Sequence, residues 1–216
     1  MATTFDQYSP CRALTMIARD FHARGWMVGT AGNLSARVMN GDAGSFWITA
    51  SGQPKGQLNE DDLMRVAIQD EAVLESPTPG HRPSAETSIH RVIYQLFPQA
   101  RAIFHTHSVE ACLAAEHTHA GAETLRLPPL EMIKGFDLWE QDPRVDLPVF
   151  DNLLDVRKVA QQIKDRFQKK PPRVPALLIH SHGVTVWGQS LQQTYHHVEL
   201  MEFILRYMAL RSHVST

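Results

Sequence analysis

Two kinds of apolar spacing alternate along this chain, and their order constrains the fold more than any other feature. Segments with helical spacing, such as 10–25 and 84–97, are separated by pairs of strand-like runs, such as 64–68 and 72–75, joined by polar turns. Hairpins pair antiparallel strands, whereas single strands between helices favour a parallel sheet. The sequence therefore predicts an α/β fold in which helices pack on a largely antiparallel sheet.

Capping residues mark three of the expected helices. Ser9 precedes Pro10, Ser84 follows a proline-rich loop, and Ser190 forms a capping-box pattern with Gln193 before a long final helix. The other expected elements are a turn over 29–35 that leads into a strand at 36–38, helices over 109–117 and 155–167, an irregular segment over 130–135, and buried strands over 102–104 and 175–179.

Length and charge exclude several classes of function. The chain of 216 residues fits one domain spanning 1–216, which can bury its core without a disulfide or a metal, so a bound metal would serve chemistry. With 21 basic and 23 acidic residues the net charge is −2, which offers no positive field to a nucleic acid. We expect no membrane partner either, because no apolar run approaches the length that spans a bilayer.

The first residues lack the charged and apolar regions of a secretory signal peptide, so we expect a cytoplasmic protein. In a reducing compartment, Cys11 and Cys112 are expected to be separate small apolar residues rather than a disulfide. Histidine is more informative, because its 12 copies include groups at the ends of two apolar strands.

His105 and His107 follow the apolar run 102–104. Residues two apart in a strand point to the same face, so both imidazoles can reach one ion. An isolated His-x-His pair is at least as often two solvent-facing side chains. The pair therefore indicates a metal site only together with further ligands.

His182 stands at a second strand end, after the apolar run 176–179 and before Gly183. It would supply the third nitrogen of a catalytic zinc site, which keeps one position open for a substrate oxygen. Taken alone, a histidine before a glycine is more often a simple turn residue. His180 is a rival ligand on the same strand.

Three short polar turns lie near element ends and carry Asn33, Ser51 with Gly52, and Ser84. Backbone N–H groups and hydroxyls in such turns can surround a phosphate, although each turn is also an ordinary turn or helix cap. Glu86 is expected in the first turn of a helix, where the helix dipole alone favours a carboxylate.

Two further polar groups need an interpretation. Glu131 lies in the irregular segment, where no structural role explains it. The final helix carries a polar set that we interpret as a solvated or subunit-facing surface. This set consists of Tyr195, His196, His197, Glu199 and Glu202.

Five segments, in this order over most of the chain, resemble the class II aldolase family. They are Gly32-Asn33-Leu34-Ser35, Ser51-Gly52, Pro83-Ser84-Ala85-Glu86, His105-Thr106-His107 and His182-Gly183. The resemblance implies a single three-layer αβα catalytic domain over 1–216, one zinc ion per subunit on three histidines, a phosphate pocket, a carboxylate and a homotetramer. The implied zinc ligands are His105, His107 and His182, the carboxylate is Glu86, and the pocket consists of Asn33, Ser51, Gly52 and Ser84.

Within this family, Leu130-Glu131-Met132-Ile133-Lys134-Gly135 looks like the segment of the dehydratases that act on a methylthio-pentulose 1-phosphate in methionine salvage. The resemblance makes Glu131 the acid that protonates the departing hydroxyl, while Glu86 assists proton removal or touches the metal. Zinc would act as a Lewis acid on a small phosphorylated keto-sugar. One difference is Ser181, because the family often has Asn before the third ligand.

Two alternatives remain at this level. A class II sugar-phosphate aldolase or a pentulose-phosphate 4-epimerase would use the same metal and phosphate residues, and the segment 130–135 argues against both. A non-catalytic binding module, as in the adducin head domain, would not need all three histidines. The residues of a pocket for the methylthio group cannot be selected from the sequence.

Overall fold

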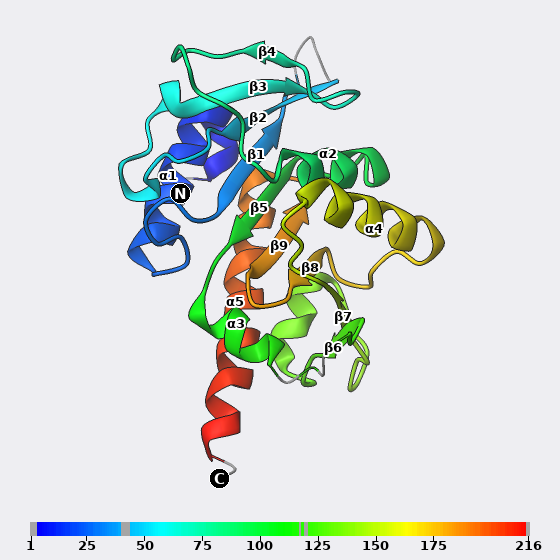
Figure 1. Ribbon diagram of the computed structural model, residues 1–216. Helices are drawn as coiled ribbons and strands as arrows, with labels where there is room; N and C mark the ends of the chain where they lie inside the picture. The colour runs from blue at the N-terminus through cyan, green and yellow to red at the C-terminus, as the bar shows by residue number, and fades with distance from the viewer. Residues whose placement is uncertain (1–3, 40–43, 117, 119–120, 215–216) are drawn as a thin grey trace.

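The computed structural model describes residues 4–39, 44–116, 118 and 121–214 (Figure 1). The helices are α1 (Pro10–Ala23), α2 (Thr87–Leu96), α3 (Val109–Ala115), α4 (Val156–Lys169) and α5 (Leu191–Val214). The strands are β1 (Asn33–Arg37), β2 (Ser45–Thr49), β3 (Leu63–Ala67), β4 (Val73–Glu75), β5 (Ala102–Thr106), β6 (Thr124–Arg126), β7 (Asp146–Phe150), β8 (Ala176–Ile179) and β9 (Gly183–Gly188). Short 3-10 helices are η1 (Phe5–Gln7), η2 (Lys55–Gln57), η3 (Glu60–Asp62) and η4 (Glu131–Phe136).

Within the described residues, nine strands form one sheet in the order β4-β3-β2-β1-β5-β9-β8-β7-β6. Its pairs are antiparallel apart from β7 with β8. Hairpins such as β3–β4 and β8–β9 account for this direction, because their short turns reverse the chain. The predicted α/β fold with a largely antiparallel sheet is confirmed.

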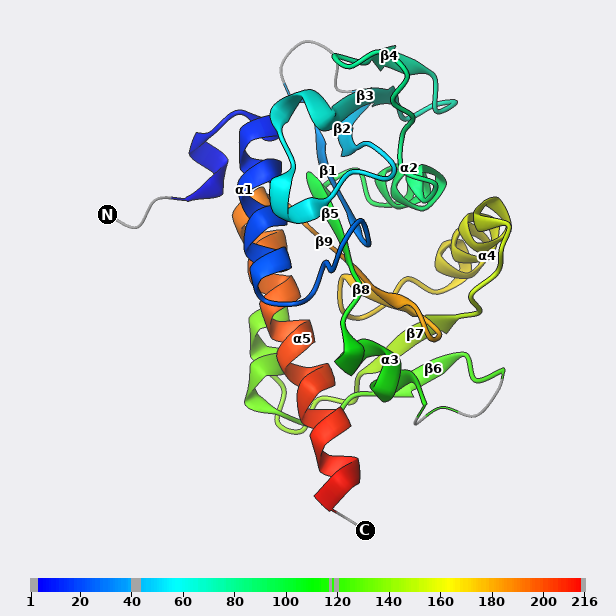
Figure 2. The ribbon, with the colours of Figure 1, turned by 60° about the vertical axis from the view of Figure 1, so that its left-hand side comes forward.

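Helices cover both faces of the sheet, which gives three layers. Figure 2 shows α1 and α5 on one side and α2 and α4 on the other. Phe104 belongs to the core beneath α1, α3 and α5, whereas the adjacent Ile103 belongs to the core beneath α2 and α4. Since successive strand residues point to opposite faces, β5 contributes to both cores. This central strand ends at the candidate site.

The predicted helix starts agree with the structure at α1 but not at α2. Ser9 Oγ accepts the N–H of Arg12 at 3.3 Å and caps α1. α2 begins at Thr87, three residues later than the predicted cap at Ser84. Ser84 Oγ instead accepts the N–H of Glu86 at 3.2 Å, which closes a short turn before the helix.

The predicted turn over 29–35 was wrong in its second half, because β1 begins at Asn33. The residues from Asn33 to Ala36 pair with β5, and these long-range hydrogen bonds outweigh the turn preference of small polar residues. β6 and β7 were not predicted, and the segment expected to be irregular forms η4. α3 ends at Ala115, and His117, the predicted end, lies outside the described residues.

The surface interpretation of the final helix was wrong for Tyr195, His197 and Glu202, which are buried. His197 Nδ1 lies 2.9 Å from the carbonyl oxygen of Trp187. Glu202 accepts the hydroxyl proton of Thr106 at 2.6 Å. Buried polar groups need such partners, and the sequence of one helix does not show what packs against it.

Cys11 and Cys112 are free and half-buried, as predicted. Burial raises the pKa of the Cys112 thiol, whose Sγ lies 3.7 Å from the carbonyl oxygen of His182. In the described part of the chain, every helix is too short or too polar to cross a membrane.

Candidate metal centre

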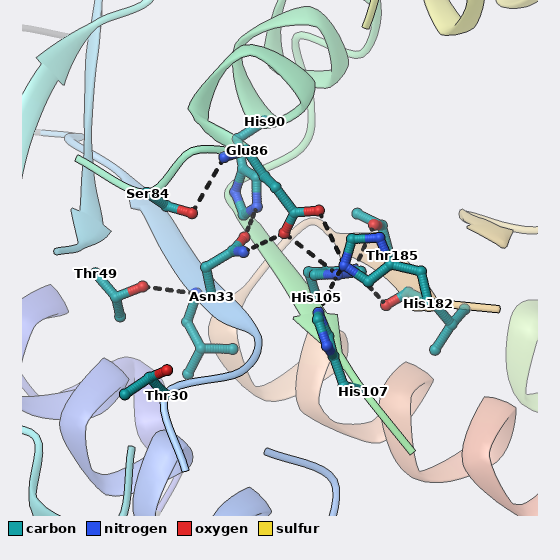
Figure 3. Close-up of polar contacts among 12 residues, drawn as sticks. Thr30, Asn33, Thr49, Ser84, Glu86, His90, His105, His107, His182 and Thr185 are labelled. Atoms are coloured by element: carbon teal, nitrogen blue, oxygen red, sulfur yellow. Dashed lines mark hydrogen bonds and ion pairs between the residues drawn. The ribbon is translucent and has the colours of Figure 1, made fainter. Parts of the chain in front are cut away.

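Three histidines meet where β5 ends beside the turn between β8 and β9 (Figure 3). The Nε2 atoms of His105 and His107 lie 2.8 Å apart, and Nε2 of His182 lies 3.4 Å from that of His105. His180 lies outside this group, and its Nδ1 hydrogen-bonds with the hydroxyl of Ser181 at 2.9 Å. The structure therefore brings together the three predicted histidines and leaves out their rival.

Glu86 completes the cluster from the N-terminal end of α2. Its Oε2 lies 3.3 Å from Nε2 of His105, and its Oε1 lies 3.4 Å from Nε2 of His182. One ligand atom from each of the four residues lies within 4.8 Å of all the others. The predicted carboxylate and the three histidines thus share one centre, which we call the metal centre.

The hydrogen bonds of His105 fix which ring nitrogen carries its proton, and the resulting arrangement suits a cation. His105 Nδ1 lies 3.1 Å from the carbonyl oxygen of Val184 and 3.0 Å from the hydroxyl of Thr185. A carbonyl only accepts, so Nδ1 carries the proton and Nε2 presents a lone pair. Burial and the nearby His182 hold the pKa of His105 well below its ordinary value, so the imidazole is neutral. A lone pair facing a carboxylate is favourable only with a cation between them, which fits zinc.

Two other observations agree with this fit. Burial, followed by the nearby His105, lowers the pKa of His107 to about 3, which keeps its imidazole neutral. Glu86 Oε1 and His182 Nδ1 are buried without a hydrogen-bond partner among the described residues. Leaving a buried acceptor unpaired costs about 1–3 kcal/mol. A metal ion would remove this cost at the Glu86 oxygen.

The turn that carries His182 depends on close backbone approach. A Cβ atom on Gly183 would lie 2.0 Å from the carbonyl oxygen of Thr106 and 3.3 Å from Cε1 of His105. Glycine therefore allows β9 to approach β5 closely enough for the imidazoles to meet. Ser181 adopts a left-handed φ of 51°, and its hydroxyl bonds to His180 rather than to a zinc ligand.

The predicted phosphate residues lie on segments beside the metal centre. Asn33 Nδ2 donates to Oε2 of Glu86 at 2.5 Å, and Ser84 caps the N–H of Glu86. The exposed turn Ser51-Gly52 follows β2, and the N–H of Ser51 donates to the carbonyl of Arg82 at 2.8 Å. The start of β1 and the two turns that carry Ser51 and Ser84 are separate in the sequence and are linked by these hydrogen bonds and by the bridge between Ala50 and Pro83.

Lys55 is a buried charge that the sequence analysis missed. Its side chain is 1% exposed, and Nζ donates to the carbonyls of Thr30 at 2.8 Å and Gln53 at 2.9 Å. Burial lowers the pKa of Lys55 to about 8, and its charge acts on His107. In the described part of the chain, no carboxylate forms an ion pair with Lys55. The ammonium thus joins two loops beside the metal centre, and nothing local in the sequence indicates that burial.

His90 is a second residue that the sequence analysis missed. It is fully buried, and its Nε2 lies 2.6 Å from Oδ1 of Asn33. It follows Glu86 by four residues, so both lie on one face of α2. That spacing was a usable signal, because a histidine one turn beyond a candidate carboxylate points in the same direction.

Glu131 does not reach the metal centre within one chain. It begins η4, its side chain is 84% exposed, and it pairs with Lys134 at 3.0 Å. η4 packs against α5. The rings of Phe136 and His197 lie 5.2 Å apart in this contact. The metal cluster found among the described residues does not include Glu131.

Comparisons with known proteins agree with the fold and identify the family. Residues 12–209 match the family model described as Class II Aldolase and Adducin N-terminal domain. A methylthioribulose-1-phosphate dehydratase of Microcystis aeruginosa is 54% identical over 199 residues, covering 92% of this chain and 94% of that protein. A dehydratase of the same name from Leptospira biflexa is 38% identical over 207 residues, covering 94% and 98% respectively.

A solved structure shows the same architecture. The L-fuculose-1-phosphate aldolase of Thermus thermophilus superposes with a TM-score of 0.71 at 23% identity, covering 94% of each chain. At this identity the likeness concerns the fold. The matched range 12–209 includes all the candidate residues. By sequence and by fold, this chain belongs to the class II aldolase and adducin N-terminal domain family.

Proposed function

We propose that this chain catalyses the dehydration of 5-methylthioribulose 1-phosphate to 2,3-diketo-5-methylthiopentyl 1-phosphate, a hydro-lyase reaction of methionine salvage. The observation that carries the proposal is 54% identity with the Microcystis dehydratase over 92% of the chain. The metal centre supports it, because three imidazoles and a carboxylate are a donor set suited to a catalytic metal.

We propose zinc, one ion per subunit, on His105, His107 and His182, with Glu86 beside it. When bound, the metal supplies Lewis acidity that polarises the substrate carbonyl. The protein keeps the imidazoles of His105 and His107 neutral by burial, and the hydrogen bond from His105 Nδ1 to Val184 fixes the tautomer that coordinates.

The substrate phosphate is proposed to bind at Asn33, at the start of β1, and at the turns that carry Ser51, Gly52 and Ser84. The position of Asn33 and Ser84 beside Glu86 supports this assignment. The Lys55 ammonium supports it further, because a buried cation without a carboxylate partner favours an anion nearby. The phosphate would then be held by neutral donors with one buried positive charge behind them.

Dehydration needs one group to remove a proton and another to protonate the departing hydroxyl. We assign proton removal to Glu86, the carboxylate inside the metal centre. We assign the second step to Glu131. Because Glu131 is exposed on η4, this role requires a neighbouring subunit to deliver it. The proposal therefore includes an assembly, the homotetramer implied by the family resemblance, with sites formed between subunits.

The test is incubation of zinc-loaded protein with methylthioribulose 1-phosphate and identification of the product by mass spectrometry and NMR. We expect loss of one water molecule, no turnover after chelation, and recovery when zinc is added back. Carbon–carbon cleavage would identify an aldolase, and inversion at a hydroxyl-bearing carbon would identify an epimerase. Tight metal binding without conversion of any of these sugar phosphates would favour a binding module.

A further inference from the structure

A line of buried hydrogen bonds runs from the protein core to the carboxylate of the metal centre. Figure 3 shows its last part, from His90 through Asn33 to Glu86. Each of its five residues is at most 8% exposed. The distances are 2.9 Å from Tyr94 Oη to Ser35 Oγ, 2.7 Å from Ser35 Oγ to His90 Nδ1, 2.6 Å from His90 Nε2 to Asn33 Oδ1, and 2.5 Å from Asn33 Nδ2 to Glu86 Oε2.

The arrangement follows from two periodicities. Asn33 and Ser35 lie two residues apart on β1 and point to one face of the sheet. Glu86, His90 and Tyr94 lie four residues apart along α2, so they form one row on the helix that packs on that face. The strand pair and the helix row therefore interleave, and His90 lies between Asn33 and Ser35.

The direction of the hydrogen bonds near Glu86 is fixed by chemistry. An ionised carboxylate only accepts, so the amide nitrogen of Asn33 faces Glu86 and its oxygen faces His90. The amide oxygen also only accepts. His90 Nε2 must therefore carry the proton.

The hydrogen bonds at the Tyr94 end of the line run in the same direction, toward Glu86. Complete burial lowers the pKa of His90 to about 4, so the ring is neutral and Nδ1 is an acceptor. The Ser35 hydroxyl therefore donates to Nδ1, and the Tyr94 hydroxyl donates to Ser35. Each donor in the line has one acceptor. Ser35 thereby selects the tautomer of His90 that Asn33 requires.

We infer that His90 is a positioning residue that locks the Asn33 amide with its nitrogen toward Glu86, and so holds the carboxylate at the metal centre. Without the N–H of His90, the amide could turn over. Its oxygen would then face Glu86 Oε2 across the present 2.5 Å separation, as two acceptors without a proton. The carboxylate would move away from the metal. The part of the inference that treats Asn33 as a phosphate-binding residue rests on the proposed function.

Zinc affinity, measured by competition with a chelator, tests the inference without any substrate. We expect His90→Leu to lower zinc affinity by roughly 10–100-fold, the usual cost of removing an outer hydrogen bond at a metal site. His90→Gln should restore most of that affinity, because its amide N–H can donate from the position of Nε2. Tyr94→Phe is the matched control from the same line and should stay near wild type, since Ser35 still donates to His90.

A second measurement remains useful if His90→Leu does not fold. Nitrogen NMR of the wild-type protein reports which ring nitrogen of His90 carries the proton. We expect the proton on Nε2, and we expect Ser35→Ala to populate the other tautomer and to lower zinc affinity less than His90→Leu does. A proton on Nδ1 in the wild type, or equal zinc affinity in folded His90→Leu, overturns the inference.

These results separate the inference from the proposed function. The expected affinity pattern in a protein that does not dehydrate methylthioribulose 1-phosphate would support the positioning role and refute the function. Dehydration of methylthioribulose 1-phosphate by the wild type, together with unchanged zinc affinity in folded His90→Leu, would support the function and refute the positioning role. The Michaelis constant adds a third comparison, because a turned Asn33 amide should raise KM for the phosphorylated substrate in His90→Leu and not in Tyr94→Phe.

Discussion

The metal centre and η4 are both assigned catalytic residues, but the chain places them in opposite environments. The His105 side chain is 1% exposed and hydrogen-bonded on the side away from the centre, whereas the Glu131 side chain is 84% exposed and pairs with the neighbouring Lys134. The first site is pre-organised within one chain. At the second site, only the position of η4 against α5 is fixed.

This difference separates metal binding from the dehydration step. A buried centre retains its geometry because packing and hydrogen bonds hold every ligand. An exposed carboxylate gains a defined position only when another surface covers it. We therefore expect metal binding to depend on one chain and dehydration to depend on at least two.

The largest expected effect is loss of the metal. His107→Ala should bind almost no zinc and should lose at least roughly 10³-fold in turnover, because the Lewis acid supplies several kcal/mol. His180→Ala is the matched control, since this histidine belongs to the same region and lies outside the cluster. Zinc content is measured by elemental analysis. Unchanged zinc in the His107→Ala protein would show that the ligand assignment is wrong.

The second effect concerns η4. Glu131→Gln should retain zinc and lose roughly 10²–10⁴-fold in kcat, the contribution of a positioned acid. Glu140→Gln, at another exposed carboxylate that pairs with Arg173, should keep normal turnover. Near-normal turnover of Glu131→Gln would remove Glu131 from the mechanism.

Mixed assemblies test whether Glu131 of one subunit serves the metal centre of its neighbour. Co-expressed His107→Ala and Glu131→Gln chains should regain part of the activity, because one chain supplies the metal centre and its neighbour supplies Glu131. Each variant alone should stay inactive. If mixing restores nothing although mixed oligomers are isolated, Glu131 does not act across subunits.

A smaller effect is expected at Lys55. Lys55→Met should lower kcat/KM for the phosphorylated substrate by roughly 10–100-fold, in line with the loss of about 1.5–3 kcal/mol for a charged hydrogen-bonding group. The effect should appear mainly in KM and should be absent with dephosphorylated methylthioribulose. Lys158→Met is the exposed control. An equal loss with both substrates would indicate a purely structural role.

The smallest effect is a pH dependence of stability in zinc-free protein. Burial lowers the pKa of His90 to about 4 and that of His107 to about 3, from an ordinary value of 6.5. Below pH 6.5 the unfolded chain gains protons that the folded chain does not, so stability falls as the pH falls. Each such histidine contributes up to roughly 1.4 kcal/mol per pH unit.

Glu202 opposes this trend between about pH 4.5 and 7, because burial raises its pKa to about 7 and stability from its neutral form is lost as the pH rises. The histidines outnumber it, so the net stability should still decrease on acidification. Urea unfolding at pH 7.5 and 5.5 measures the change. His90→Gln should reduce the slope of the unfolding free energy against pH by about one proton. An unchanged slope would contradict the neutral state of His90.

Much of the metal centre could be predicted because it depends on local geometry. The alternation of strand side chains placed His105 and His107 on one face, and the adjacent apolar run placed them at a strand end. The hairpin pattern likewise predicted the antiparallel sheet. These features depend on residues within a few positions of one another, which a sequence displays directly.

Spacing along the sequence was enough to predict the histidine pair, the strand ends and the fold class. Spacing left His180 as a rival of His182, and the packed chain shows that His180 lies outside the centre, that Asn33 begins a strand, that Lys55 and His90 are buried, and that Glu131 lies apart. These outcomes depend on backbone approach and desolvation between segments distant in the chain, such as Gly183 against Thr106. Local spacing carries no information about such contacts, because burial is a property of the packed molecule.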